Sequence, residues 1–311
     1  MKEKKKTYRF KSDIELALLA VPGLLWLLIF CYLPLVGNFI AFKDFKIFEG
    51  GFLHSLFKSA WVGFKNFAYL FASSETKIIL RNTIGYNFIF IVLNTVIPII
   101  TAIALNELWN RNASKLYQSI MFFPYFLSWV VISYFLQAFL DPTKGMINKL
   151  LINAGGEYIN FYLEPGYWPY LLIFLYVWKS LGYGTVMYLA AIIGIDKSLY
   201  EAAMLDGAGK LQQIRYITLN FLKPVATVLI VLAVGKILNS DFGLFYQVPK
   251  NSGALFSVTQ TLDTYVYRAM IGLGDMGMTS AAVLFQSSVG FVLVVCVNQF
   301  IKKIDPDNAL F

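Results

Sequence analysis

Long apolar runs alternate with shorter polar segments along most of the chain, and this pattern predicts helices that cross a membrane. A bilayer core needs roughly 20 mostly apolar residues in helical form. Runs of this length are too long for the core of a water-soluble domain. The six predicted spans are residues 16–41, 79–105, 118–140, 168–194, 223–241 and 278–301.

The composition supports this interpretation. Of the 311 residues, 58% are hydrophobic and only 14% are charged, and the mean hydropathy is +0.62, far from the averages of soluble domains. The first apolar run follows a basic tail, as in a secretory signal peptide. It is too long for a signal h-region and no A-x-A site closes it, so we interpret it as an uncleaved span.

Basic residues indicate the orientation of the spans. Short cytoplasmic segments of multi-pass proteins are enriched in Lys and Arg. Thirteen such residues lie in residues 1–15, 106–117, 195–222 and 302–311, whereas nine are spread over the much longer loops of the other side. This difference in density predicts that both termini are cytoplasmic. The net charge of +8 is therefore attributed to membrane topology and not to nucleic-acid binding.

Few residues suit enzymatic chemistry. Cys31 and Cys296 both fall in apolar spans, so neither a disulfide framework nor a metal site is indicated. His54 is the single histidine. An intramembrane enzyme would need a nucleophile with a base, or metal ligands, at membrane depth. Carboxylates are almost confined to loops and span ends, so this class is disfavoured.

Two features of the apolar regions suggest local structure. Prolines and glycines in the spans (Pro22, Pro34, Pro98, Gly182 and Gly184) are compatible with bent helices around a cavity and equally with close helix packing at small residues. Residues 51–71 place aromatic side chains near helical spacing, which predicts an amphipathic element at the membrane surface. These aromatic residues are Phe57, Trp61, Phe64, Phe67 and Phe71.

The segment EAAMLDGAGKLQQIRYITLNFLKP (201–224) is the only long polar run between apolar segments in the second half of the chain. Its GAGK sequence is not a nucleotide-binding loop, because Met204 stands where a P-loop has its first glycine and Leu211 where it has Ser or Thr. The apolar spacing predicts two short helices around a turn at Asp206-Gly207, with Pro224 at the entrance of the next span. Docking into a groove of another protein and lying on lipid headgroups are both compatible with such a segment.

This segment resembles the EAA loop of permease subunits from binding-protein-dependent ABC importers, whose pattern runs roughly EAAxxDGAxxxQxFxxITLPxLxP. Ile214 replaces the usual aromatic residue and keeps an apolar contact. Asn220 replaces the usual proline and removes a fixed φ, which is expected to loosen the second helix. The matching residues are Glu201, Ala202, Ala203, Asp206, Gly207, Ala208, Gln212, Ile217, Thr218, Leu219, Leu222 and Pro224.

Three further segments resemble the carbohydrate-importing branch, especially its polysaccharide-type (LplB-like) permeases. They are WVGFKNF (61–67), RNTIGYN (81–87) and DFGLFYQVPKNSGALFSVTQTLDTYVYRA (241–269). The resemblance covers nearly the whole chain and implies an all-α integral membrane fold, the six-helix bundle of type I ABC importer permeases. We therefore expect a cytoplasmic tail, first span and external loop in 1–77, a permease core in 78–301 and a cytoplasmic tail in 302–311.

The resemblance also implies partners in the plasma (inner) membrane. A second related permease and two cytoplasmic ATPase subunits would complete the complex, an external binding protein would deliver sugar, and ATP and Mg would bind the ATPases, with no cofactor in this chain. The EAA loop (200–224) would couple to an ATPase cleft through Glu201, Ala202, Ala203, Asp206, Gly207 and Ala208. A permease for amino acids or phosphonates is the alternative, whereas a self-contained channel or carrier leaves the EAA loop unexplained.

Ionisable side chains inside a span are functional candidates. Lys179 lies 11 residues after Trp168, about 16 Å along the fourth helix, and shares a helical face with Tyr176 and Tyr183. Aromatic rings stack on a sugar and an ammonium binds its hydroxyls or carboxylate. Pairing of Lys179 with a carboxylate of the partner permease is equally open.

Polar residues elsewhere complete the candidate pathway. Asn94, Asn239 and Asp241 are expected either to line a cavity or to hydrogen-bond between helices. Lys236, nearer the outer end of the fifth span, is expected to snorkel. With Lys179 it would make an aqueous path positive, and we therefore predict a preference for anionic or polar saccharides.

Overall fold

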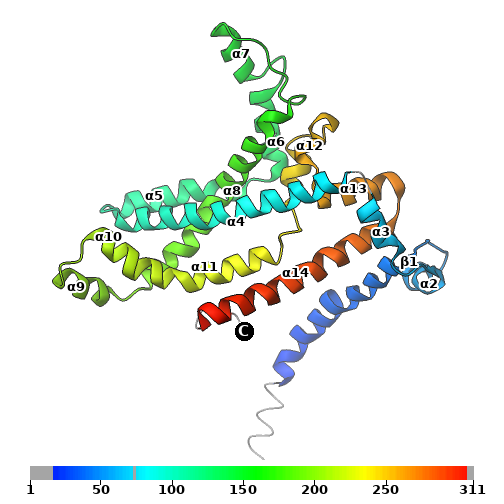
Figure 1. Cartoon of the computed structure of the whole chain (residues 1–311), viewed down its shortest axis with the longest axis horizontal. Coiled ribbons are helices and arrows are strands. Elements are labelled where there is room, and N and C mark those ends of the chain that lie inside the picture. The colour runs from blue at the N-terminus through cyan, green and yellow to red at the C-terminus, as the bar shows by residue number, and fades with distance from the viewer. Residues whose placement is uncertain (1–16, 73–74, 307–311) are drawn as a thin grey trace, which may run out of the picture. The chain divides into compact units, whose positions relative to one another are not determined.

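The computed structural model describes residues 17–72 and 75–306, and these residues are helical apart from short connections and one two-stranded sheet (Figure 1). The predicted all-helical class is confirmed with that exception. The chain forms two compact units, residues 1–72 with 269–284 and residues 73–268 with 285–311. The basic N-terminal tail and the end of the C-terminal tail lie outside the described residues, and the predicted divisions after residues 77 and 301 stay predictions.

Five helices of the described chain are long and apolar enough to cross a bilayer, and a bent pair gives a sixth if it is counted as one span. The number agrees with the six predicted spans on that count. The five are Ala17–Phe42, Thr76–Glu107 (α4), Pro165–Ile193 (η4 and α8), Lys210–Val234 (α10, η5 and α11) and Met276–Lys303, most of α14 (Met276–Ile304).

The predicted span over 118–140 is not one continuous helix. Arg111–Phe126, which contains α5 (Arg111–Phe122) and η3 (Phe123–Phe126), meets Trp129–Leu140 (α6) at 97°. Pro124 is the second residue of η3, and Leu127 and Ser128 have extended backbones. The Ser128 hydroxyl accepts a hydrogen bond from the Val131 amide at 3.3 Å and starts α6 as its N-cap. The segment is therefore apolar enough for a span, but it bends at Leu127 and Ser128 because their backbones are not helical.

In the first unit, the segment after the first span folds into a small subdomain. β1 (Lys43–Asp44) pairs antiparallel with β2 (Ala60–Trp61), and α2 (Gly51–Lys58) lies between them in the chain, before α3 (Lys65–Ala72). The Lys43 ammonium donates to the carbonyls of Leu56 (2.6 Å) and Ser59 (3.3 Å). Residues 51–71 are therefore not one amphipathic helix, because Trp61 lies in a strand between two helices.

In the second unit, α4 and α8 (Trp168–Ile193) form the central pair (Figure 1). α8 is continuous through Gly182 and Gly184, so these glycines do not bend it. A Cβ at Gly184 would come within 2.9 Å of the Pro98 ring, and one at Gly182 would meet the backbone of Met121 and Phe122. Close helix packing, the second of the two open interpretations, thus accounts for both glycines.

We expect Gly182→Ala to destabilise the protein, by about 1–3 kcal/mol, the usual cost of overpacking. Backbone atoms of α5 cannot move aside as a flexible side chain can. Gly85→Ala on α4 is the matched control, because nothing lies within 4 Å of a Cβ there and alanine favours the helix. Thermal unfolding in detergent checks this: a midpoint for Gly182→Ala equal to that of Gly85→Ala would contradict it.

The fifth span differs from the predicted residues 223–241 at both ends. The helix runs continuously through α10 (Lys210–Gln213), η5 (Ile214–Thr218) and α11 (Leu219–Val234), so Pro224 lies inside it and not at its entrance. The Asn220 amide donates to the Tyr216 carbonyl at 2.6 Å. Helical backbone stops at Val234, which leaves residues 235–241 almost entirely non-helical.

Shorter elements complete the second unit and lead into the last helix. A Cβ at Gly290 of α14 would collide with the Gly235 carbonyl, so two glycines allow the end of α11 to approach α14. The shorter elements are α7 (Met146–Asn153), η4 (Pro165–Tyr167), α9 (Lys197–Leu205), η6 (Gly243–Gln247), η7 (Gly253–Leu255), α12 (Phe256–Thr259) and α13 (Leu262–Leu273).

Candidate functional site

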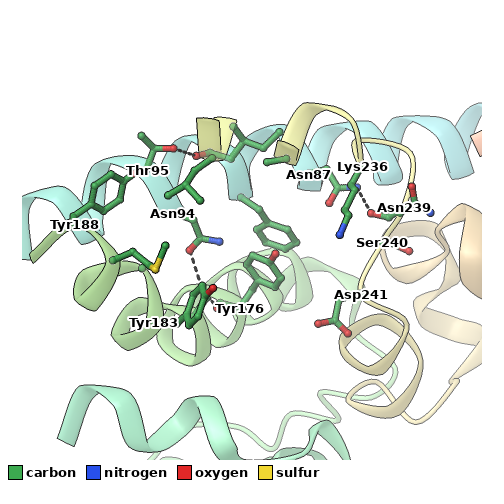
Figure 2. A pocket seen from close by; sticks show the side chains of 17 residues that line it. Asn87, Asn94, Thr95, Tyr176, Tyr183, Tyr188, Lys236, Asn239, Ser240 and Asp241 are labelled. Atoms are coloured by element: carbon green, nitrogen blue, oxygen red, sulfur yellow. Dashed lines mark hydrogen bonds between the residues drawn. The ribbon is translucent and has the colours of Figure 1, made fainter. Parts of the chain in front are cut away.

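A cavity of about 570 Å³ lies in the second unit between α4, α8, the end of α11 and residues 235–241 (Figure 2). Its wall combines aromatic rings, amides and two charged side chains. Tyr176 stacks on Phe90 with a centroid distance of 3.8 Å. The polar and aromatic lining residues are Asn87, Phe90, Asn94, Thr95, Tyr176, Ser180, Tyr183, Tyr188, Lys236, Asn239, Ser240 and Asp241.

Side-chain hydrogen bonds hold the non-helical wall of this cavity. The Asn87 amide donates to the carbonyls of Ile237 (2.9 Å) and Asn239 (3.0 Å). The Gln286 amide donates to the Leu238 carbonyl at 2.8 Å. Carbonyls freed by the end of α11 are thereby satisfied, which is the condition for irregular backbone at membrane depth.

The two charged residues of the cavity come from this same irregular segment, and Figure 2 shows both directed into the cavity. The Asp241 carboxylate accepts from the Trp129 indole N–H at 2.8 Å and from the Leu244 amide at 3.2 Å. Among the described residues, no hydrogen bond or ion pair engages the Lys236 ammonium. The cavity therefore offers one anchored carboxylate and one uncommitted cation.

Five of the six predicted pathway residues line the cavity: Asn94, Tyr176, Tyr183, Asn239 and Asp241. Asn94 also accepts a hydrogen bond from Ser180 at 2.7 Å, so it joins α4 to α8 as well. Lys236 was expected to snorkel, yet it faces the cavity. Its position depends on the early end of α11, which the apolar pattern does not reveal.

Lys179 is not among the lining residues of the cavity, contrary to the expectation of a shared face with Tyr176 and Tyr183. Its ammonium donates to the carbonyls of Tyr125 (2.8 Å) and Leu127 (2.7 Å) and lies 5.5 Å from the centroids of the Tyr125 and Trp129 rings. These carbonyls end the helical segment before the 97° bend, where a cation is favourable. Lys179 therefore stabilises the bend.

The second candidate site is the loop around α9. Asp196 caps the helix, its carboxylate accepting from the Ser198 amide at 2.9 Å, and this bond lowers the pKa of the exposed Asp196 carboxyl below its usual value. The Gly207 amide donates to the Met204 carbonyl (3.0 Å) and the Ala208 amide to the Ala203 carbonyl (2.8 Å). This is a Schellman ending with Gly207 at φ +80°.

Internal contacts fix the loop while its tip stays exposed. Tyr200 and Thr218 hydroxyls are 2.9 Å apart, and the buried Gln213 amide donates to the Ala208 carbonyl at 3.0 Å. Lys210 forms an ion pair with Glu107 of α4 at 2.9 Å. In contrast, Leu205 and Leu211 are 89% and 82% exposed. The predicted turn between two helices is present, but the second helix is not short, because it is the beginning of the continuous helix Lys210–Val234. Leu205 and Leu211 are available to a partner.

Glu201, Ala202, Asp206 and Gly207 are also exposed, whereas Ala203 and Ala208 are half-buried. The exposed members share the outer surface of one short helix and its turn. The described residues contain no group of three or more His, Cys, Asp or Glu residues that would hold a metal ion. This loop therefore offers an exposed helix and turn with two acidic side chains, Glu201 and Asp206, as a docking element does.

Comparison with known proteins identifies the class. Residues 94–308 match the family described as the binding-protein-dependent transport system inner membrane component, and the chain belongs to this family. It is a multi-pass component of the inner membrane and a permease subunit of an ABC importer. Members are transport subunits, and ATP is bound and hydrolysed by separate ATPase subunits.

The most informative relatives are from Bacillus subtilis (strain 168). The polygalacturonan/rhamnogalacturonan transport system permease protein YteP is 35% identical over 97% of this chain and 92% of its own length. Protein LplB is 35% identical over 96% and 92%. Among solved structures, a chain of a bacterial alginate ABC transporter in complex with an alginate pentasaccharide-bound periplasmic protein has a TM-score of 0.82 and 29% identity, covering 96% of this chain and 97% of that one.

Proposed function

We propose that this permease imports oligosaccharides, and in particular acidic ones, through the cavity between α4, α8 and residues 235–241. The observation that carries the proposal is the uncommitted Lys236 ammonium in a wall of tyrosines and amides. Tyrosine rings pack against the apolar face of a sugar, amides and Asp241 bind hydroxyls, and Lys236 binds a carboxylate. The names of YteP and of the alginate transporter support the same class of cargo.

The partners follow from the same proposal. The chain pairs with a second permease and two cytoplasmic ATPase subunits, and an external binding protein delivers the sugar. Both termini and the α9 loop lie in the cytoplasm, as the density of basic residues favours. Glu201, Ala202, Ala203, Asp206, Gly207 and Ala208 form the docking surface for the ATPase.

The mechanism is alternating access. Closure of the ATPases on ATP moves the docked α9 loops, and the permeases shift between outward- and inward-open states. ATP binding biases this equilibrium only through contacts that differ between the two states. In this chain the α9 loop contributes those contacts, and the Lys210–Glu107 ion pair and the Tyr200–Thr218 hydrogen bond transmit the displacement to α4 and to η5 of the fifth span.

We expect Lys236→Met to reduce uptake of a galacturonate oligosaccharide about tenfold, the loss that corresponds to one charge-assisted contact. Uptake of a neutral oligosaccharide of the same length should change little. Lys236→Arg keeps the charge and is the matched control. The measurement is uptake by proteoliposomes containing the whole importer, with cognate binding protein saturated with each sugar. Equal losses for the acidic and neutral sugars would contradict the assignment of Lys236.

A further inference from the structure

A second hollow, of about 410 Å³, lies on the surface of the second unit between α6 and the connection from η6 to η7. It is separate from the cavity described above, and the two have no lining residue in common. Its lining includes Ser133, Tyr134, Tyr246, Gln247, Lys250 and Asn251. Tyr134, at 66% exposed, forms its rim, and this hollow has no part in the mechanism proposed so far.

The backbone beneath this hollow is unusual. Lys250 and Asn251 have φ values of +55° and +48°, a left-handed conformation that is unfavourable for a residue such as lysine. Surrounding bonds impose it: the Asn251 amide donates to the Tyr246 carbonyl at 3.0 Å and the Arg268 guanidinium to the Asn251 side chain at 3.1 Å. Strain of this kind is typical of functional sites.

The strained backbone presents Lys250 to the hollow. Its ammonium donates to the Gln137 side-chain oxygen and lies 5.0 Å from the centroid of the Tyr134 ring. An ammonium has three N–H donors, and one hydrogen bond to Gln137 leaves the others for a ligand. An exposed aromatic ring and an amide of α6 therefore meet a lysine of the connection from η6 to η7.

We propose that this hollow is a binding site for one sugar unit of an oligosaccharide cargo, outside the main cavity. The inference rests on the function proposed above. The Tyr134 ring packs on the sugar face, and Lys250 and Gln137 bind its hydroxyl and carboxylate groups. Trp129, whose indole binds Asp241 of the cavity, precedes Gln137 by about 12 Å on the same helix. In this proposal a long oligosaccharide contacts both sites, whereas a short one contacts one of them.

The test uses the whole importer in proteoliposomes with its binding protein, and a galacturonate hexamer and dimer as probes. Tyr134→Ala removes the ring. Lys250→Asn removes the charge with a residue that tolerates the left-handed backbone. Tyr170→Ala is the matched control, because Tyr170 is an exposed tyrosine of α8 outside both sites. We expect the concentration of liganded binding protein for half-maximal hexamer uptake to rise about three- to tenfold in the first two variants, the range for one aromatic contact, and dimer uptake to stay unchanged.

Three results would overturn the proposal: no change for the hexamer, an equal change for the dimer, or an equal loss of ATP hydrolysis stimulated by sugar-free binding protein. The last result would mean that the hollow docks a protein. If the wild-type importer takes up neutral oligosaccharides and no galacturonate, the acidic cargo class is wrong. In that case, reduced uptake of maltohexaose but not of maltose by the Tyr134→Ala and Lys250→Asn variants would still support a sugar site in the hollow. Unchanged uptake of maltohexaose would reject it.

Discussion

Replacement of Glu201 by alanine and Gly207 by valine is expected to abolish uptake by the assembled importer. Valine at φ +80° costs about 1–2 kcal/mol of conformational free energy and disrupts the Schellman ending that sets the orientation of α9. Loss of the exposed Glu201 carboxylate removes the charge-assisted contact proposed with the ATPase, which alone corresponds to about a tenfold loss or more. Sugar-stimulated ATP hydrolysis should fall together with uptake.

Folding should survive in this double variant, since α9 and its turn are mostly exposed. Gly209→Ala is the matched control in the same loop, because its φ of −71° suits any residue and only Gln212 lies near a Cβ there. Uptake and ATP hydrolysis are measured in proteoliposomes, and the amount of folded complex by size-exclusion chromatography. Normal uptake by the double variant would remove the α9 loop from coupling.

Lys179→Met is expected to destabilise the permease and leave its choice of sugar unchanged. Two carbonyls at the bend lose their charged donor, and since Lys179 is only half-buried, we expect a loss of roughly 2 kcal/mol. Thermal unfolding in detergent and the yield of assembled complex measure the effect. Lys179→Arg, which keeps N–H donors, should recover part of the stability.

The contrast with Lys236→Met makes this prediction decisive. Lys179→Met should lower the unfolding midpoint and keep the ratio of galacturonate to neutral uptake. Lys236→Met should keep the unfolding midpoint and lower that ratio. If Lys179→Met assembles like the wild type and loses acidic uptake selectively, Lys179 faces cargo and does not serve to stabilise the bend. The two lysines are thereby distinguished by two independent measurements.

Much of this architecture follows from the sequence. Five of the spans are long apolar runs, and burial of backbone polar groups in a bilayer requires helices there. The turn at Gly207 also follows from local chemistry, because glycine adopts positive φ without steric cost. The match of the EAA segment indicated the family, which residues 94–308 confirm.

Apolarity alone determined neither the bend of the third span nor the end of the fifth. Both are decided by contacts between distant residues: Lys179 satisfies carbonyls at the bend, and Asn87 satisfies those of residues 237 and 239. A backbone group can leave a helix inside a membrane only where such a partner exists.

The roles of the lysines illustrate the same limit. The sequence by itself determined that Lys179 and Lys236 lie in apolar segments and that such charges need a partner or an aqueous cavity. Only the tertiary structure decided between these, because the bend brings two carbonyls to Lys179 and the early end of α11 turns Lys236 into the cavity. The hydropathy pattern shows that each lysine lies in an apolar segment, where its charge is costly. Three-dimensional packing decides which groups compensate that cost.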